Sequence, residues 1–238
     1  SATTISACTG IYTSNLYGCS PITIHDNIQS IGSSATGTTS FAFGNNTKAY
    51  GDYSHAEGTD TIASGGDSHA EGRATIATGS GAHAEGVSTT ASGGKAPHAE
   101  GGDTIASGNF SHAEGRFTIA SGGTSHAEGN NTIAYGENSH AEGNDTQATG
   151  TTSHAEGYRT RAYGNYSHAE GNNTQATGST SHAEGDSTTA GGNYSHAEGG
   201  NTIASGNYSH AEGSGTTASG DHSHAEGFYT KSYGQYSH

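Results

Sequence analysis

Histidine and glutamate recur together in the tetrapeptide His-Ala-Glu-Gly, and both side chains can act as acid–base groups, metal ligands or ion-pair partners. Every interval between copies is fourteen residues except one, which is fifteen. A final histidine, His238, stands in the same position. The side chains that could carry this chemistry are therefore part of a sequence repeat. The tetrapeptide begins at His55, His69, His83, His98, His112, His126, His140, His154, His168, His182, His196, His210 and His224.

The spacing within the repeat argues against catalysis and against a dedicated metal site. On an extended strand, His and Glu two positions apart lie about 6.5–7 Å apart on one face, and successive repeats lie about 4.8 Å apart. A zinc site needs three or four ligands that converge at about 2.0–2.1 Å from the ion, and a flat ladder within one chain does not converge. The Ser that precedes most of these His points to the opposite face, which excludes a nucleophilic triad. We expect no catalytic residue, no metal site and no cofactor.

The element that positions these side chains is a seven-residue unit. Between the copies of His-Ala-Glu-Gly lies Thr-Ile-Ala-Ser-Gly, for example at Thr61, Thr104, Thr118 and Thr202, or a variant of it. Both motifs follow the pattern [Ser/Thr]-x-Ala-x-Gly. A coiled coil is excluded because a Gly in every heptad costs a helix about 1 kcal/mol per site and no apolar a/d pair exists.

Strand alternation explains the pattern. It places Ser/Thr, Ala and Gly inside a thin roll and the two x residues outside, while Gly and the next two residues form the turn. We therefore predict an all-β, parallel β-solenoid, a β-roll with fourteen residues and two short strands per coil, of about fourteen coils over residues 39–238. The fifteen-residue interval falls at 94–97, where we expect a one-residue bulge in a turn.

Residues 1–38 lack the heptad, and we expect a β-rich connector there. Cys8 and Cys19 lie in this segment. A Cys8–Cys19 disulfide, two free thiols and an inter-chain bond fit the sequence equally well.

Composition excludes several classes of protein. Only 28% of residues are hydrophobic, 40 are Gly, and the formal net charge is −15. Such values are typical of disorder, but the strict period indicates a solenoid with a narrow core of small side chains. The seven Lys and Arg are scattered, so nucleic acid is not expected as a partner. No apolar run approaches the roughly 20 residues of a membrane span.

The repeats, such as Asn165–Gly178, resemble the YadA-like (Hep_Hag) head repeats of trimeric autotransporter adhesins, and more closely the SHAEG-repeat regions of phage tail-fibre and virion appendage proteins. The resemblance covers about residues 40–238. It implies a left-handed parallel β-roll, a homotrimeric rod, an extracellular or virion-surface location, and attachment or display as the role. One departure is that His and Glu stand where the family's inward-facing strand usually carries aliphatic residues.

We interpret the His and Glu positions as the contact between chains. They never vary, and a Glu of one chain can accept from a His of its neighbour. The equivalent slots of the other strand include Arg161 and Lys231, which would bring like charges together at a three-fold axis. A solvated charge ladder is the alternative. The predicted ladder comprises His55, Glu57, His69, Glu71, His112, Glu114, His126, Glu128, His140, Glu142, His154, Glu156, His168, Glu170, His182, Glu184, His196, Glu198, His210 and Glu212.

Three functions follow from these observations. The first is a structural or attachment segment of a trimeric extracellular fibre, such as a viral tail fibre or surface appendage. The second is a bacterial adhesin head whose surface binds matrix, a receptor or glycan, with Tyr and Phe near the turns as contact groups. The third, ice binding by Thr ladders, is disfavoured because alternation turns the Thr of Thr-x-Ala-x-Gly inward.

Overall fold

The computed structural model describes residues 28–30 and 32–238 of the chain. Over this part of the chain every regular element is a β-strand, and all strand pairs are parallel, which confirms the predicted solenoid. No helix in the described part is long and apolar enough to cross a membrane. Cys8, Cys19 and most of the predicted connector lie outside the described residues.

Two kinds of strand alternate along the chain. The odd-numbered strands, apart from the first, are five residues long and carry His-Ala-Glu-Gly from β5 onward; the even-numbered strands have two residues. The odd-numbered strands are β1 (Ile28–Gln29), β3 (Phe41–Asn45), β5 (His55–Thr59), β7 (His69–Arg73), β9 (His83–Val87), β11 (His98–Gly102), β13 (His112–Arg116), β15 (His126–Asn130), β17 (His140–Asn144), β19 (His154–Tyr158), β21 (His168–Asn172), β23 (His182–Asp186), β25 (His196–Gly200), β27 (His210–Ser214) and β29 (His224–Phe228). The even-numbered strands are β2 (Ser34–Ala35), β4 (Lys48–Ala49), β6 (Ile62–Ala63), β8 (Ile76–Ala77), β10 (Thr90–Ala91), β12 (Ile105–Ala106), β14 (Ile119–Ala120), β16 (Ile133–Ala134), β18 (Gln147–Ala148), β20 (Arg161–Ala162), β22 (Gln175–Ala176), β24 (Thr189–Ala190), β26 (Ile203–Ala204), β28 (Thr217–Ala218) and β30 (Lys231–Ser232).

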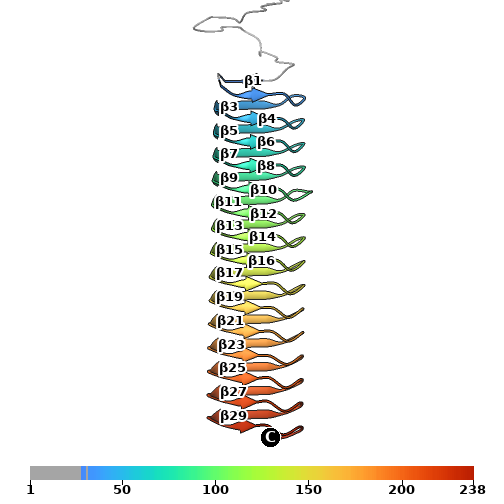
Figure 1. Cartoon of the computed structure of the whole chain (residues 1–238), viewed down its shortest axis with the longest axis vertical. Helices are drawn as coiled ribbons and strands as arrows, with labels where there is room; N and C mark the ends of the chain where they lie inside the picture. The colour runs from blue at the N-terminus through green and yellow to red at the C-terminus, as the bar shows by residue number, and fades with distance from the viewer. Residues whose placement is uncertain (1–27, 31) are drawn as a thin grey trace, which may run out of the picture.

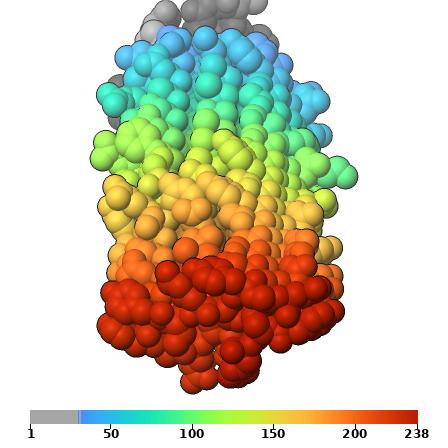
Figure 2. Space-filling view, turned by 60° about the horizontal axis from the view of Figure 1, so that its bottom comes forward, coloured from blue at the N-terminus to red at the C-terminus, as the bar shows by residue number. Residues whose placement is uncertain are grey.

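Each kind of strand forms its own 15-stranded sheet, and each strand pairs with the strand two elements away in the chain. The result is a straight stack of coils in chain order (Figure 1). Pairing is in register, so His140 lies beside His154 and Glu142 beside Glu156. In the space-filling view the coils form successive bands whose side chains align in rows (Figure 2). The pairing begins with β1 and β2, within the segment for which the sequence predicted a connector.

The core between the two sheets consists of small side chains. Ala63, Ala77 and Ala106 are completely buried, as predicted, and so are their equivalents in nearly every coil. Thr61 and Ser68 represent the two polar positions that flank these alanines, and they are 0% and 2% exposed. Each coil therefore buries little apolar area, and the packing leaves no room for larger side chains.

The glycines of the two motifs differ in burial and backbone conformation. The prediction that alternation places both glycines inside the roll is therefore wrong for one of them. Gly150, from Thr-Gln-Ala-Thr-Gly, is buried as predicted, whereas Gly143, from His-Ala-Glu-Gly, is partly exposed and has φ of +114°. A Cβ on Gly150 would lie 1.9 Å from the carbonyl oxygen of Gly164, and one on Gly143 would lie 2.1 Å from that of Gly157. Glycine is thus required at both positions because the backbones of neighbouring coils approach closely.

The left-handed conformation of the turns falls mainly on residues other than glycine. Asp67 and Asp145, for example, both have φ of +56°. Such residues ordinarily carry a conformational cost. Here their N–H groups donate to the coil before, as Asp67 does to the carbonyl of Asp52 at 2.8 Å. The turns are therefore hydrogen-bonded from coil to coil as the strands are.

The fifteen-residue coil accommodates its extra residue in the turn between β10 and β11, as predicted. Ala96 has φ of +40°, and an isolated bridge pairs Ser80 with Lys95. The register is restored at once, because His83 pairs with His98. This turn extends further from the stack than its neighbours do (Figure 1).

Candidate functional site

The outward side chains of β5 to β29 form one continuous surface, which we call the His/Glu face. Its histidine rings stack along the axis, with successive centroids 4.7–4.9 Å apart from His55 to His224. Most neighbouring rings are nearly parallel, while the pair His112 and His126 is tilted by 42°. At the N-terminal end the ring of Phe41 meets that of His55 edge to face at 4.7 Å.

Each histidine leans toward the glutamate of its own strand. The Nε2 atom of His55 lies 3.4 Å from an Oε atom of Glu57, and the other pairs lie at 3.6–4.0 Å. The ladder includes the whole predicted set and also three pairs omitted from it: His83 with Glu85, His98 with Glu100, and His224 with Glu226. The same tetrapeptide marks these pairs, so the sequence contained the signal.

The ring nitrogens of this face are poorly satisfied. The histidine side chains are 33–39% exposed, yet their Nε2 atoms are buried and have no hydrogen-bond partner. The pKa values of His154 and His168 lie below the ordinary value for histidine. Burial is the largest cause, and the charge of neighbouring histidines adds to it, whereas nearby Glu side chains act in the opposite direction. The same causes lower the pKa of His69, His98 and His126. These five rings therefore favour the neutral form.

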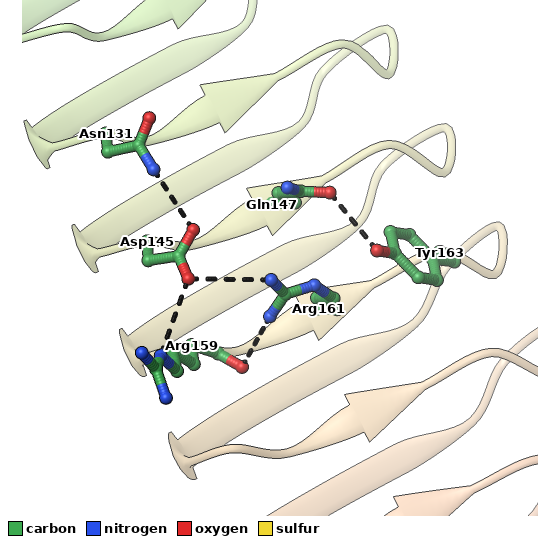
Figure 3. Close-up of polar contacts among 6 residues, drawn as sticks. All are labelled: Asn131, Asp145, Gln147, Arg159, Arg161 and Tyr163. Atoms are coloured by element: carbon green, nitrogen blue, oxygen red, sulfur yellow. Dashed lines mark hydrogen bonds and ion pairs between the residues drawn. The ribbon is translucent and has the colours of Figure 1, made fainter.

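The opposite surface of the stack, which we call the second face, consists of the first x positions of the even-numbered strands. Its residues change from coil to coil, from Ile133 to Gln147 to Arg161. Figure 3 shows how the arginine is accommodated: its guanidinium lies 3.6 Å from Asp145 and donates to the carbonyl oxygen of Arg159 at 2.9 Å. Asp145, which also lies 3.7 Å from Arg159, thus gives Arg161 an ion-pair partner within its own chain.

Aromatic side chains line one edge of the stack near the C-terminal end. Tyr194, Tyr208, His222 and Tyr236 stack at 4.8–5.0 Å, with interplanar angles of 3–15°. Each inner ring of this stack is covered on both faces by its neighbours. This row of aromatic rings therefore presents mainly ring edges and phenolic hydroxyls to a ligand.

The arrangement offers hydrogen bonding, ion pairing and metal ligation rather than nucleophilic chemistry. Ser139 precedes His140 but is 2% exposed, and its hydroxyl donates to the carbonyl of Gly136. The Thr ladder, including Thr132 and Thr146, is 0% exposed, so it cannot form an ice-binding surface.

Comparison with protein families gives one match. The model for the YadA head domain repeat, in two copies, matches residues 35–54, 56–82, 99–125, 113–139, 127–153 and 197–227, which together make up more than half of the chain. The chain belongs to this family. Its head repeats explain the parallel solenoid and identify the chain as a structural, adhesin-type surface segment. A search of curated proteins found no match.

Proposed function

We propose that the chain forms the shaft of a homotrimeric extracellular fibre, with the His/Glu faces of three copies turned toward a common axis. The observation that carries this proposal is the constancy of that face. The same pair of side chains recurs thirteen times in register, while the second face changes from coil to coil. When three copies pack in register around an axis, each coil meets the equivalent coil of the other two copies, so one compatible pair of side chains can serve at every level, whereas a solvated surface is free to vary.

The composition of the core indicates that a single chain needs partner chains for stability. It is built of Ala, Ser and Thr, which bury little apolar area per residue. A thin stack of this kind gains less stabilisation than a compact domain of equal length. Packing three stacks together would bury one sheet of each and would give the unpartnered His Nε2 atoms access to carboxylates of neighbouring chains.

The second face fits a position on the outside of the fibre. Arg161 is 24% exposed and paired with Asp145 of its own chain, so it needs no partner from another copy. At a three-fold axis three such guanidinium groups would converge, which is unfavourable.

We further propose that the fibre is a viral tail fibre or surface appendage, because its repeats resemble the SHAEG-repeat regions of such proteins. A bacterial adhesin head is the second candidate, and the exposed aromatic side chains favour it. Tyr53 and Tyr166 are both 63% exposed at the turns, where they can contact a receptor or glycan. Electron microscopy distinguishes the two candidates by showing whether the slender rod is attached to virions or to cells.

Site-directed cross-linking tests the orientation of the chains. Two variants, Glu142→Cys on the His/Glu face and Gln147→Cys on the second face, are made in a background with Cys8→Ser and Cys19→Ser. A short bis-maleimide should join chains in the Glu142→Cys variant only. Light scattering should give about three times the 23.8 kDa of one chain. A folded monomer at micromolar concentration, or cross-linking through Gln147→Cys alone, would contradict the proposal.

A further inference from the structure

Two overlapping groups of ligands occur in the His/Glu face at the level of the fifteen-residue coil. His83, Glu85 and His98 form one group, and His98, Glu100 and His112 form the other; in each, one ligand atom per residue lies within 4.8 Å of the others. We propose that this cluster binds one divalent transition-metal ion of the zinc type. All ligands come from one chain, so the inference does not depend on the trimer proposed above.

The donor set suits zinc. Two imidazole nitrogens and one carboxylate oxygen, with a fourth position open to water, are a common ligand set of zinc. In a tetrahedral site with bonds of about 2.1 Å, two ligand atoms lie about 3.4 Å apart. The Nε2 to Oε distances of 3.8 Å in His83–Glu85 and 3.9 Å in His98–Glu100 are already close to that value.

The histidines would have to tilt toward each other, and the structure indicates that they can. The rings of His83, His98 and His112 are nearly parallel, but their side chains are about one-third exposed. The next pair in the ladder, His112 and His126, shows a tilt of 42° at the same spacing. No hydrogen bond has to be broken, since the Nε2 atoms of all three residues are buried without a partner.

The cluster adjoins the fifteen-residue coil, the one irregular interval between copies of His-Ala-Glu-Gly. His98 follows Pro97, the only proline among the described residues, at the end of the fifteen-residue coil. Pro97 is buried at a position where most other coils have Ser and one has Ala82, and its carbonyl accepts from the N–H of His83 at 2.9 Å, as the equivalent carbonyl does in the other coils. His98 belongs to both groups, and a neutral imidazole binds one metal ion, so one ion per chain is expected.

Cobalt provides the test because four-coordinate Co²⁺ absorbs visible light. The full chain is refolded from denaturant with Co²⁺ and then dialysed, so that the face is accessible whether or not it lies between chains. We expect about one Co²⁺ per chain, visible absorption of four-coordinate geometry, and displacement by Zn²⁺. His98→Gln should abolish this binding, and so should the double variant Glu85→Gln/Glu100→Gln, which keeps the histidine stack.

The matched control is His196→Gln, which removes a ladder histidine outside the cluster and should leave the stoichiometry and the spectrum unchanged. Circular dichroism checks that each variant is folded. Absence of bound Co²⁺ would overturn the proposal. So would several ions per chain whose number falls equally in His98→Gln and His196→Gln, because that result would mean unspecific binding along the whole ladder.

Discussion

The hydroxyl of Ser139 donates a hydrogen bond of 2.7 Å to the carbonyl oxygen of Gly136, three residues earlier. Thr132, one motif earlier in the same core, is completely buried, but its hydroxyl has no hydrogen-bond partner. These two buried hydroxyls thus differ in role: that of Ser139 closes a turn, and that of Thr132 only fills space.

This difference predicts opposite effects of two conservative substitutions. Thr132→Val replaces an unpartnered hydroxyl by a methyl group of similar size and should raise the free energy of unfolding by about 1 kcal/mol. Ser139→Ala removes a hydrogen bond and should lower it by about 1 kcal/mol. Denaturant titrations at one fixed chain concentration provide the comparison. A loss of stability in Thr132→Val would mean that its hydroxyl has a partner, for example a buried water.

Adjacent glycines offer a second matched pair. A Cβ on Gly122 would lie 1.9 Å from the carbonyl oxygen of Gly136, whereas one on Gly123 would meet nothing nearer than a side-chain carbon at 3.9 Å. Gly122→Ala should therefore lower the free energy of unfolding by about 3 kcal/mol or more, because neighbouring coils must separate. Gly123→Ala should change it by less than about 0.5 kcal/mol. Thermal unfolding of both variants tests this, and equal stabilities would argue against the close stacking of coils.

The pH dependence follows from the lowered pKa of His154 and His168. Because the unfolded chain takes up protons at a higher pH than the folded chain does, their contribution to stability is complete above pH 6.5. It is lost as the pH falls below 6.5 through the pKa of the folded state. Denaturation midpoints at pH 7.5, 6.5 and 5.5 should show this decrease.

The double variant His154→Gln/His168→Gln should reduce the slope of stability against pH. The control Gln147→Ala, which removes no ionisable group, should leave the slope unchanged. Higher stability at pH 5.5 than at 7.5 would show that attraction to Glu outweighs burial in this ladder.

The assembly itself gives a fourth prediction, which rests on the proposed orientation. Removing His140 and His154 together by substitution with Ala should weaken the trimer strongly, since both lie on the proposed contact. Removing Ile133 and Gln147 together should have little effect. Sedimentation over a range of chain concentrations measures the change in each dissociation constant. Equal and negligible effects from both pairs would mean that neither face forms the contact.

The sequence predicted the coil, its two strands and its alanine core because one physical rule, alternation along an extended chain, determines all three. It predicted Gly143 wrongly because a residue with φ of +114° departs from that alternation. It also could not show that His140 leans to within 3.9 Å of Glu142, since side-chain rotamers are set by neighbours in the next coil. For the same reason the cluster around His98 was not predicted from the period.

The in-register stacking of coils has a consequence for how such a gene can change. Each strand bonds only to its counterparts in the coils before and after, so removing fourteen residues joins two equivalent edges and preserves both sheets. Removing seven would instead place a five-residue strand against a two-residue one. Recombination between repeats can therefore lengthen or shorten the rod in steps of one coil, about 4.8 Å, while the coils that remain keep their surface composition. The length of the rod can thus change from one variant of the gene to another without a new fold having to evolve.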